Sequence, residues 1–310
     1  MHCSVETSYF RAIVSRMTKT IVTHDGKFHA DEVFAVAALL LVHPDATVIR
    51  TRKENLIKQG DIVVDVGGIY DEATNRFDHH QIGGARIRES DIPYAAFGLV
   101  WKKFGEKLCG SADVARQVEK VLVAPIDAND NGIDLSVPKF LDSAPYEISD
   151  AIRSFTPTWQ EKDLSLDANF TEAVLFAKRI IEREITRAKA VISGKEKVEE
   201  LYHSASDKRL IVLPEDFSWK DTLARFQEPL YVVHPQNDTW RLYCVRDNPH
   251  VFANRRDLPE SWAGLRGEAL AKITGVPDAV FAHRNRFMAV AETKEGALAL
   301  AELALKYIEI

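Results

Sequence analysis

Apolar positions in the first part of the chain occur as short β-branched runs separated by a longer apolar segment. The longer segment, ADEVFAVAALLLVH (residues 30–43), predicts a buried helix with acidic residues in its first turn. The short runs predict buried strands, and they are KTIVTH (19–24), ATVIRT (46–51) and DIVVDVGG (61–68). Continuously apolar strands that alternate with helices are typical of an α/β fold with a doubly wound, mostly parallel sheet.

Longer periodic segments follow these strands. Residues 94–108 and 112–125 predict two helices, and the polar segment IDANDNG (126–132) after them predicts a loop. A long helix is expected from Asn169 to about His203, broken or bent near Ser193-Gly194. The remainder predicts a smaller α+β domain, with strands at 209–214, 230–235, 240–245, 278–283 and 286–292 and helices at 268–273 and 294–307.

These elements divide the chain into an N-terminal extension (1–18), a first α/β domain (19–165), a linker helix (166–205) and a C-terminal domain (206–310). The extension carries Arg11 and Arg16 and has two interpretations. It is either a weak organellar presequence or an over-called, disordered tail ahead of a true start at Met17. We favour the tail, which predicts a cytoplasmic protein, with a mitochondrial location as the alternative.

Composition narrows the class of protein. The 310 residues carry a net charge of −6, which argues against a protein that coats long nucleic acid through bulk electrostatics. Phosphate substrates remain compatible, because bound metal ions supply positive charge locally. Three well-separated cysteines argue against a disulfide scaffold and favour a reducing compartment. The apolar run Val33–Val42 is too short to cross a bilayer.

Aspartate and histidine gather in four separate segments. Parallel strands present their carboxyl ends at one sheet edge, where ligands bind, so side chains that follow such strands are expected to meet. Imidazoles and carboxylates without thiolates are the donors that two carboxylate-bridged divalent metals require. Each segment alone is a weak signal, and the four together are specific: THDGKFHADE (23–32), DVGGIYD (65–71), DHHQ (78–81) and IDANDNG (126–132).

A family resemblance extends this interpretation. From Thr20 to the C-terminus the chain resembles the melanocyte proliferating gene 1 (MYG) family of the DHH phosphoesterase superfamily, which is named for its Asp-His-His motif. The motifs that carry the resemblance occur in order: THDGKFHADE, IRTR, DIVVDVGGIYD, DHHQ, DANDNG, PTW, SWKD and SWAGLRGEAL. The resemblance implies a DHH-type catalytic domain at 19–165 and a substrate-binding domain at 206–310.

The resemblance implies an enzyme: a two-metal-dependent phosphodiester hydrolase, acting as a 3′–5′ exonuclease on RNA or short oligonucleotides. A water that bridges the metals would be the nucleophile. The expected cofactors are two divalent ions, with Mn²⁺ first and Zn²⁺, Fe²⁺, Co²⁺ or Mg²⁺ as alternatives. RNA or an oligonucleotide is the expected partner, with no membrane and with either a monomer or a homodimer as the assembly. The alternatives are a phosphatase or pyrophosphatase on a small phosphorylated molecule, and a non-catalytic metal-stabilised binding protein.

The resemblance also implies a role for individual residues. His80 would face the phosphate as a hydrogen-bond donor or acid, and Asp78 would orient a histidine from behind. The implied ligands are His24, His29 and Asp65 for one ion and Asp31, Asp65, His79 and Asp127 for the other, with Asp130 as the rival to Asp127.

Substrate contacts are expected from both domains. Arg50 and Arg52 in IRTR are candidates for a phosphate clamp, and the alternative is a solvated strand end with one arginine paired to a carboxylate. His283 is expected to meet the substrate. After it the chain departs from a glycine-rich stretch of the family, and Arg284 and Arg286, alternating in an extended segment, are expected to replace backbone amides as phosphate contacts. The alternative is that both arginines point to solvent and pair with acidic residues downstream.

Overall fold

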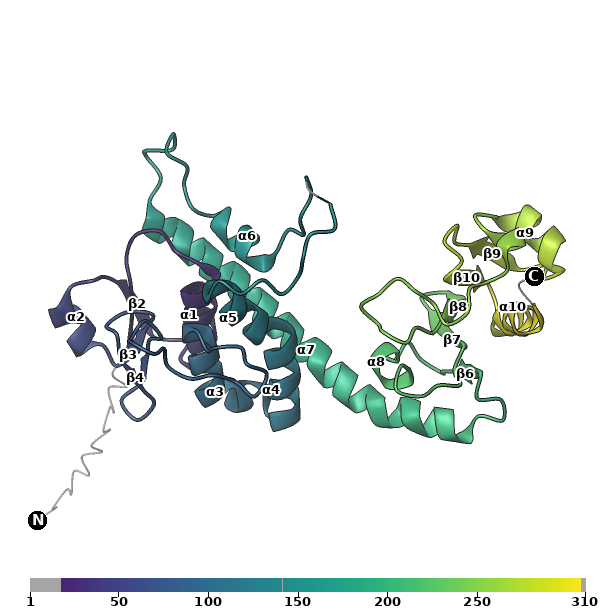
Figure 1. Cartoon of the computed structure of the whole chain (residues 1–310), viewed down its shortest axis with the longest axis horizontal. Coiled ribbons are helices and arrows are strands. Elements are labelled where there is room, and N and C mark those ends of the chain that lie inside the picture. The colour runs from purple at the N-terminus through teal and green to yellow at the C-terminus, as the bar shows by residue number, and fades with distance from the viewer. Residues whose placement is uncertain (1–17, 141, 308–310) are drawn as a thin grey trace, which may run out of the picture. The chain divides into compact units, whose positions relative to one another are not determined.

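The structure, a computed structural model, describes residues 18–140 and 142–307. The N-terminal extension expected over 1–18 therefore lies outside the described residues, apart from Thr18. The chain forms two compact units, and the boundary falls between Ile185 and Thr186. This α/β architecture with two sheets confirms the predicted fold class (Figure 1).

The first unit contains one five-stranded sheet in the order β2-β1-β3-β5-β4. Four strands are parallel, and β4 pairs antiparallel with β5. The three longer strands were predicted, whereas the β4–β5 hairpin was not, because strands of two residues leave no periodic signal. The strands are β1 (Thr20–Thr23), β2 (Thr47–Arg50), β3 (Ile62–Val64), β4 (Tyr70–Asp71) and β5 (Arg76–Phe77).

Helices lie on both sides of this sheet. The short helix α2 (Glu54–Gln59) lies on one side, where its Ile57 packs against Val22 and Val63 (Figure 1). On the other side lie α1 (Ala30–Val42) and α3 (Ala96–Cys109), which pack against each other (Figure 1). α1 is apolar all round and mostly buried, as expected of a helix inside a core.

The segment expected to form a loop at 126–132 is helical at its start, so that prediction is wrong. α4 (Ala112–Val118) continues through a π-helical turn (Glu119–Val123) into α5 (Ala124–Asp130). Asp127 lies on the buried side of α5, where its carboxylate accepts the backbone N–H of Gly98 and pairs with Arg88. Pro125 lies just after the π-helical turn within this continuous helix, and it has no N–H to donate to the preceding turn.

After α6 (Ile148–Arg153), the long helix α7 runs from Leu166 to Ser204. It passes from the first unit into the second and continues without a break at Ser193-Gly194, contrary to expectation. An added Cβ at Gly194 would meet only Phe217 and Ser218 at ordinary contact distances, so this glycine marks no steric constraint. None of the described helices is both long enough and apolar enough to cross a membrane.

The second unit contains a mixed sheet in the order β6-β7-β8-β10-β9. β6 and β7 are parallel, and the other pairs are antiparallel. The strands are β6 (Leu210–Val212), β7 (Tyr231–Gln236), β8 (Thr239–Cys244), β9 (Ala279–Ala282) and β10 (Met288–Ala291), and the helices are α8 (Lys220–Leu223), α9 (Gly267–Thr274) and α10 (Lys294–Lys306).

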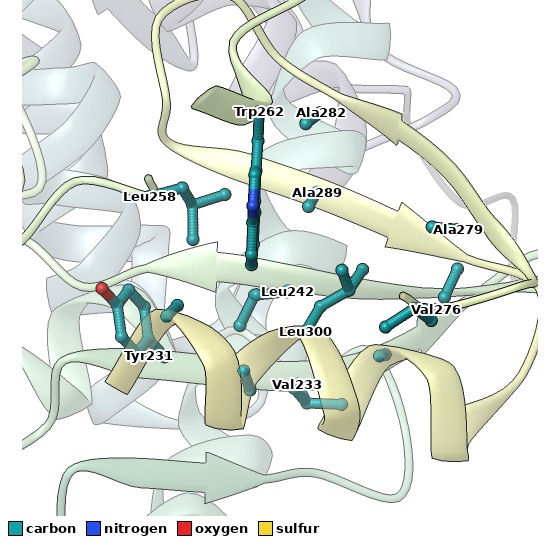
Figure 2. Close-up of a cluster of buried hydrophobic side chains, with 14 of the residues drawn as sticks. Tyr231, Val233, Leu242, Leu258, Trp262, Val276, Ala279, Ala282, Ala289 and Leu300 are labelled. Atoms are coloured by element: carbon teal, nitrogen blue, oxygen red, sulfur yellow. The ribbon is translucent and has the colours of Figure 1, made fainter. Parts of the chain in front are cut away.

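Each face of the second sheet buries its own cluster. On one face, Trp262 and Leu300 of α10 pack over Leu242 of β8 (Figure 2). On the other face, Tyr202 from the end of α7 and Trp219 before α8 pack with the opposite side chains of the strands. Alternation along β7 and β8 supplies both clusters, since successive side chains of a strand point to opposite faces.

Candidate metal centre

Strand order explains why distant segments meet at one place in the first unit. β1, β3 and β5 are parallel neighbours, so their carboxyl ends lie at one edge of the sheet. His24 follows β1 directly, Asp65 follows β3, and Asp78 to His80 follow β5. Asp130 at the end of α5 joins the same group. This confirms the expectation that several of the Asp and His segments converge.

Asp65 lies at the centre of the site. Its φ of 55° is in the left-handed region, which aspartate tolerates better than most residues. Its Oδ2 lies 3.3 Å from His24 Nε2, and its Oδ1 lies 3.4 Å from His79 Nε2. One carboxylate therefore faces two histidines that follow different strands, with one oxygen toward each.

A buried pair of His24 and Glu32 lies beside Asp65. His24 Nε2 is 2.9 Å from Glu32 Oε1, and its Nδ1 is 3.0 Å from the carbonyl oxygen of Asp25. Donation from Nδ1 to that carbonyl leaves Nε2 available as a metal ligand. The ligand atoms of His24, His29 and Glu32 all lie within 4.8 Å of one another.

Sequence analysis did not identify Glu32 as a candidate ligand. Glu32 is the third residue of α1, and its carboxylate accepts the backbone N–H of His29 ahead of the helix. A glutamate at this position is usually a capping residue, which concealed its proximity to His24. Its complete burial is the feature that distinguishes it, and burial depends on the tertiary structure.

The second cluster contains Asp31, His79 and Asp130. His79 Nε2 is 3.1 Å from Asp130 Oδ2 and 4.0 Å from Asp31 Oδ2. Asp31 is fully buried, and its two oxygens accept backbone N–H groups from the first turn of α3. The N-cap residue of α3, Ala95, has no side-chain acceptor, so Asp31 performs this function from another segment. The fold thus holds Asp31 in place independently of any ion.

Asp127 lies outside both clusters in this structure. Its Oδ1 accepts the backbone N–H of Gly98 at 3.0 Å, and its Oδ2 lies 2.6 Å from Arg88 Nη2. It is fully buried, and Arg88 also pairs with Glu119. The structure therefore brings Asp130, rather than Asp127, to His79.

Two buried atoms of the site have no hydrogen-bond partner, namely Asp65 Oδ1 and His79 Nε2. Leaving buried polar atoms unsatisfied costs free energy, and these two face each other at 3.4 Å. A divalent cation would satisfy both atoms. Imidazole nitrogens and carboxylate oxygens are donors that Mn²⁺, Fe²⁺, Co²⁺ and Zn²⁺ accept, so the residues present fit such an ion.

The pKa values of the clustered residues also fit a site for a cation. Burial lowers the pKa of His24, but the carboxylates of Asp65 and Glu32 outweigh it and raise the pKa to about 10. Burial likewise lowers the pKa of His79, but Asp130 and Asp65 raise it to about 11. Burial acts to raise the pKa of Asp65, yet the nearby imidazoles of His24, His79 and His80 hold that pKa well below its usual range. Protons occupy imidazoles here because the carboxylates carry excess negative charge.

His80 lies at the exposed margin of this group, with its Nδ1 3.3 Å from Asp65 Oδ1, and Asp65, His79 and His80 form a third set of donor atoms close enough to share an ion. The His80 side chain is 62% exposed, while Asp78 behind it is almost fully buried. Asp78 Oδ1 lies 2.9 Å from His80 Nδ1 and accepts the His80 backbone N–H at 3.0 Å, and its Oδ2 accepts the N–H of Gly68. The Asp65 carboxylate raises the pKa of His80, and Asp78 adds to this effect. Burial acts in the other direction, and the resulting pKa is about 9. Asp78 thus lies where it can orient His80, the arrangement that the resemblance implies.

A cavity of about 390 Å³ opens beside the clusters. Two cations line it, Lys27 and Arg52, together with His80. The Arg52 side chain is 64% exposed and lies 3.5 Å from an oxygen of Asp25. Lys27 was not identified from the sequence, because a single lysine in a loop carries no pattern of its own.

Arg50 has a different environment from Arg52. Its guanidinium donates to Asp167 of α7 and to the carbonyl of Gly26, each at 2.6 Å, and lies 4.4 Å over the ring of Phe170. Its side chain is only 5% exposed, and it is not among the residues that line the cavity. These contacts tie α7 to the loop between His24 and His29.

His283, Arg284 and Arg286 lie in the second unit, between β9 and β10. The expectation of an extended segment is wrong, because the Arg286 N–H donates to the His283 carbonyl at 2.8 Å and closes a turn. Arg286 has a φ of 58°, and its guanidinium pairs with Asp257 at 2.8 Å. Arg284 is exposed at the turn, so the two arginines have different surroundings.

Comparisons with known proteins cover the same segments. A family model for MYG1_exonuc, described as an uncharacterised protein family (UPF0160), matches residues 20–305. The "MYG1 exonuclease" of Homo sapiens is 31% identical over 92% of this chain and 85% of its own length. That of Bos taurus is 32% identical, with 92% and 84% covered. The "MYG1 protein" of Saccharomyces cerevisiae is 31% identical, with 94% and 97% covered. The family match spans every segment that supplies the clustered side chains.

Proposed function

This chain belongs to the MYG1 exonuclease family, and from that premise we propose that it is a two-metal-dependent phosphodiester hydrolase. Its substrate is RNA or a short oligonucleotide, shortened from the 3′ end, and its first unit is a DHH-type catalytic domain. The observation that carries the proposal is the Asp65 carboxylate, whose two oxygens face His24 and His79 respectively. Such a carboxylate is positioned to bridge two ions.

Two groups of residues would hold the ions. His24, His29 and Asp65 hold the first, with Glu32 as an additional donor. Asp31, His79 and Asp130 hold the second, and Asp65 serves both. Asp130 replaces Asp127 in this assignment, because Asp130 Oδ2 lies 3.1 Å from His79 Nε2, whereas Asp127 pairs with the buried Arg88 outside both clusters. The mixed donor set favours Mn²⁺, with Zn²⁺, Fe²⁺, Co²⁺ and Mg²⁺ as alternatives.

When bound, the two ions lower the pKa of a water between them, which supplies the nucleophile for attack on phosphorus. The protein positions the phosphate through His80, Arg52 and Lys27, which line one cavity. Without bound ions, the carboxylates of Asp65 and Asp78 raise the pKa of His80 to about 9. His80 faces the cavity as a hydrogen-bond donor or general acid toward a phosphate oxygen or the leaving oxygen, while Asp78 orients its ring.

Product analysis with end-labelled RNA tests this function. With Mn²⁺ present, a 5′-labelled oligonucleotide should give a ladder that shortens one nucleotide at a time, and a 3′-labelled one should release labelled mononucleotide at once. Asp65→Asn should lower the rate by about a thousandfold or more, as expected when a unit of catalytic groups is broken. Asp113→Asn, on an exposed carboxylate of α4, is the matched control and should keep full activity.

Other products would assign another activity to the same site. Phosphate release from small phosphorylated molecules with intact RNA would indicate a phosphatase or pyrophosphatase. Metal binding without turnover of either substrate would indicate a binding protein, and the proposal would then be wrong.

A further inference from the structure

The second unit has a cavity of about 360 Å³ that the metal centre does not use. We call it the aromatic pocket, because four of its lining residues are aromatic and two are cations: Trp219, Tyr243, Phe252, Phe287, Lys220 and Arg246. It lies on the residues at the end of β8, the start of α8 and the connection that follows β8.

The aromatic rings of the pocket include surfaces available for stacking. Tyr243 stacks on His234 with the ring centroids 5.5 Å apart and the planes 8° from parallel. Phe287 lies near Tyr243 at 6.5 Å, tilted by 21°. Phe252 is 87% exposed, so much of its apolar surface meets water in this structure. Planar rings with exposed faces are the means by which proteins bind unstacked nucleobases.

The two cations lie over these rings. The Arg246 guanidinium is 4.7 Å from the Phe252 centroid and 5.9 Å from that of Phe287. Lys220 Nζ lies 5.9 Å from the Tyr243 centroid. Both charges therefore lie beside the ring faces, where the phosphate of a stacked nucleotide would lie within reach.

Neither cation forms an ion pair with a described carboxylate. Several arginines of the same unit do form ion pairs, including Arg225 with Glu199, Arg255 with Asp247 and Arg286 with Asp257. Arg246 makes one long hydrogen bond, from Nε to the side-chain oxygen of Asn254 at 3.3 Å. Positive charge that is not neutralised within the fold remains available for an anionic ligand.

A second cavity of about 470 Å³ adjoins the aromatic pocket. The two cavities share Trp219, Lys220 and Tyr243, and the second adds Arg187, His234 and His250. Two carboxylates also line it, Asp216 and Asp221, and Asp216 lies 3.2 Å from His234. The two cavities are therefore neighbours that share part of their lining.

We propose that the aromatic pocket binds a nucleotide unit of single-stranded nucleic acid, with the base stacked on Phe252 and neighbouring rings and the phosphate on Arg246 and Lys220. The choice of a nucleotide over other planar anions rests on the proposed function. The pocket holds substrate and takes no part in bond cleavage, because none of the candidate metal ligands lies in the second unit. The ligand that this pocket would recognise is a base with an attached phosphate. Single strands and free nucleotides both contain this unit.

Equilibrium binding to the full-length chain tests this inference. Fluorescence anisotropy would follow 5′-labelled pentaadenylate RNA on protein carrying Asp65→Asn, with Mn²⁺ present, so that the probe is not consumed. Adding Phe252→Ala and Arg246→Gln should weaken binding about tenfold or more, since replacing one stacking ring by alanine typically has an effect of this size. Phe140→Ala, on an exposed aromatic ring of the first unit, is the matched control and should leave the affinity unchanged.

Two further probes separate stacking from charge and a strand from a free nucleotide. A pentamer with abasic sites should bind more weakly than pentaadenylate and should not respond to Phe252→Ala. If AMP displaces the labelled probe at a lower concentration than unlabelled pentaadenylate does, the ligand is a free nucleotide. If unlabelled pentaadenylate displaces it at the lower concentration, the ligand is a strand. Equal affinity for the abasic and normal pentamers, or a change below twofold in the double variant, would overturn the inference.

A small chromogenic diester keeps this result separate from the proposed function. Bis(p-nitrophenyl) phosphate reports the metal centre without needing a base-binding pocket, so the wild type and the pocket double variant should cleave it at equal rates. Pentaadenylate binding that depends on Phe252, without diester cleavage by the wild type, would retain the pocket and reject the hydrolase. Diester cleavage by the wild type without base-dependent binding of pentaadenylate would retain the hydrolase and reject the pocket.

Discussion

Asp127 and Asp130 are three residues apart in α5, yet the structure gives them different environments. Asp130 lies 3.1 Å from His79, whereas Asp127 pairs with the buried Arg88 at 2.6 Å. We therefore assign Asp130 to metal binding and Asp127 to the stability of the fold. The assignment can be tested by comparing the two carboxylates directly.

We predict opposite effects for Asp130→Ala and Asp127→Ala. Asp130→Ala should reduce bound Mn²⁺ from two equivalents toward one without destabilising the metal-free protein. Asp127→Ala leaves the Arg88 guanidinium buried without this partner, which should cost about 3–5 kcal/mol of unfolding free energy. Metal analysis and urea denaturation in EDTA measure the two effects. Loss of metal without loss of stability in Asp127→Ala would restore Asp127 as the ligand.

The histidines of the site predict how metal affinity depends on pH. In the metal-free protein the pKa is about 10 for His24 and about 11 for His79, so both imidazoles are protonated at pH 7.5. A metal binds only the neutral imidazole and must displace these protons. Affinity for Mn²⁺ should therefore rise with pH between pH 6 and 9, and binding at pH 7.5 should release protons.

Calorimetry in two buffers with different ionisation enthalpies counts the released protons. Mn²⁺ titrations in HEPES and in Tris should give binding enthalpies that differ by the buffer difference multiplied by one to two protons. Asp65→Asn is the control, because the loss of this carboxylate weakens Mn²⁺ binding and should reduce the number of protons released. Identical enthalpies in the two buffers would contradict the protonated state of His24 and His79.

Two glycines in helices illustrate how an element depends on its neighbours. At Gly98, in the first turn of α3, an added Cβ would collide with the Asp127 carboxylate and with the Arg88 guanidinium. At Gly194, inside α7, it would meet Phe217 no closer than 3.8 Å. The first glycine permits the buried ion pair to lie against α3, and the second has no such role.

The same substitution should accordingly have opposite signs in the two helices. Gly98→Ala should destabilise the protein by about 1–3 kcal/mol, because the buried pair must shift. Gly194→Ala should stabilise it by roughly 0.5–1 kcal/mol, because alanine loses less backbone entropy in a helix. Urea denaturation in EDTA measures both. A stable Gly98→Ala would show that Asp127 and Arg88 can move at little cost.

At the level of the whole molecule, all proposed metal ligands lie in the first unit, before Ile185. They come from the ends of separate strands and helices, so bound ions connect segments that are distant in sequence. Ligand binding stabilises the native state by about 2.7 kcal/mol when its free concentration is a hundred times the Kd. This stabilisation should be confined to the unit that contains the site.

Hydrogen–deuterium exchange with and without Mn²⁺ locates this effect. Amides around His24, Asp65 and His79 should exchange more slowly with Mn²⁺ than in EDTA, whereas amides of β7, β8 and β10 should be unchanged. Asp65→Asn should remove the difference. Equal slowing in both units would mean that the ions act beyond the proposed ligands.

The main strands, the helix over residues 30–42 and the convergence of His24, Asp65 and His79 were predictable from the amino-acid sequence. These follow from local pattern, because β-branched runs form buried strands and parallel strands end at one edge. Four features required the folded structure: the choice between Asp127 and Asp130, the contact of Glu32 with His24, the burial of Arg50 and the turn at Arg286. In each of these cases the outcome depends on which buried partner lies nearest in space, and spacing along the chain carries no record of that partner.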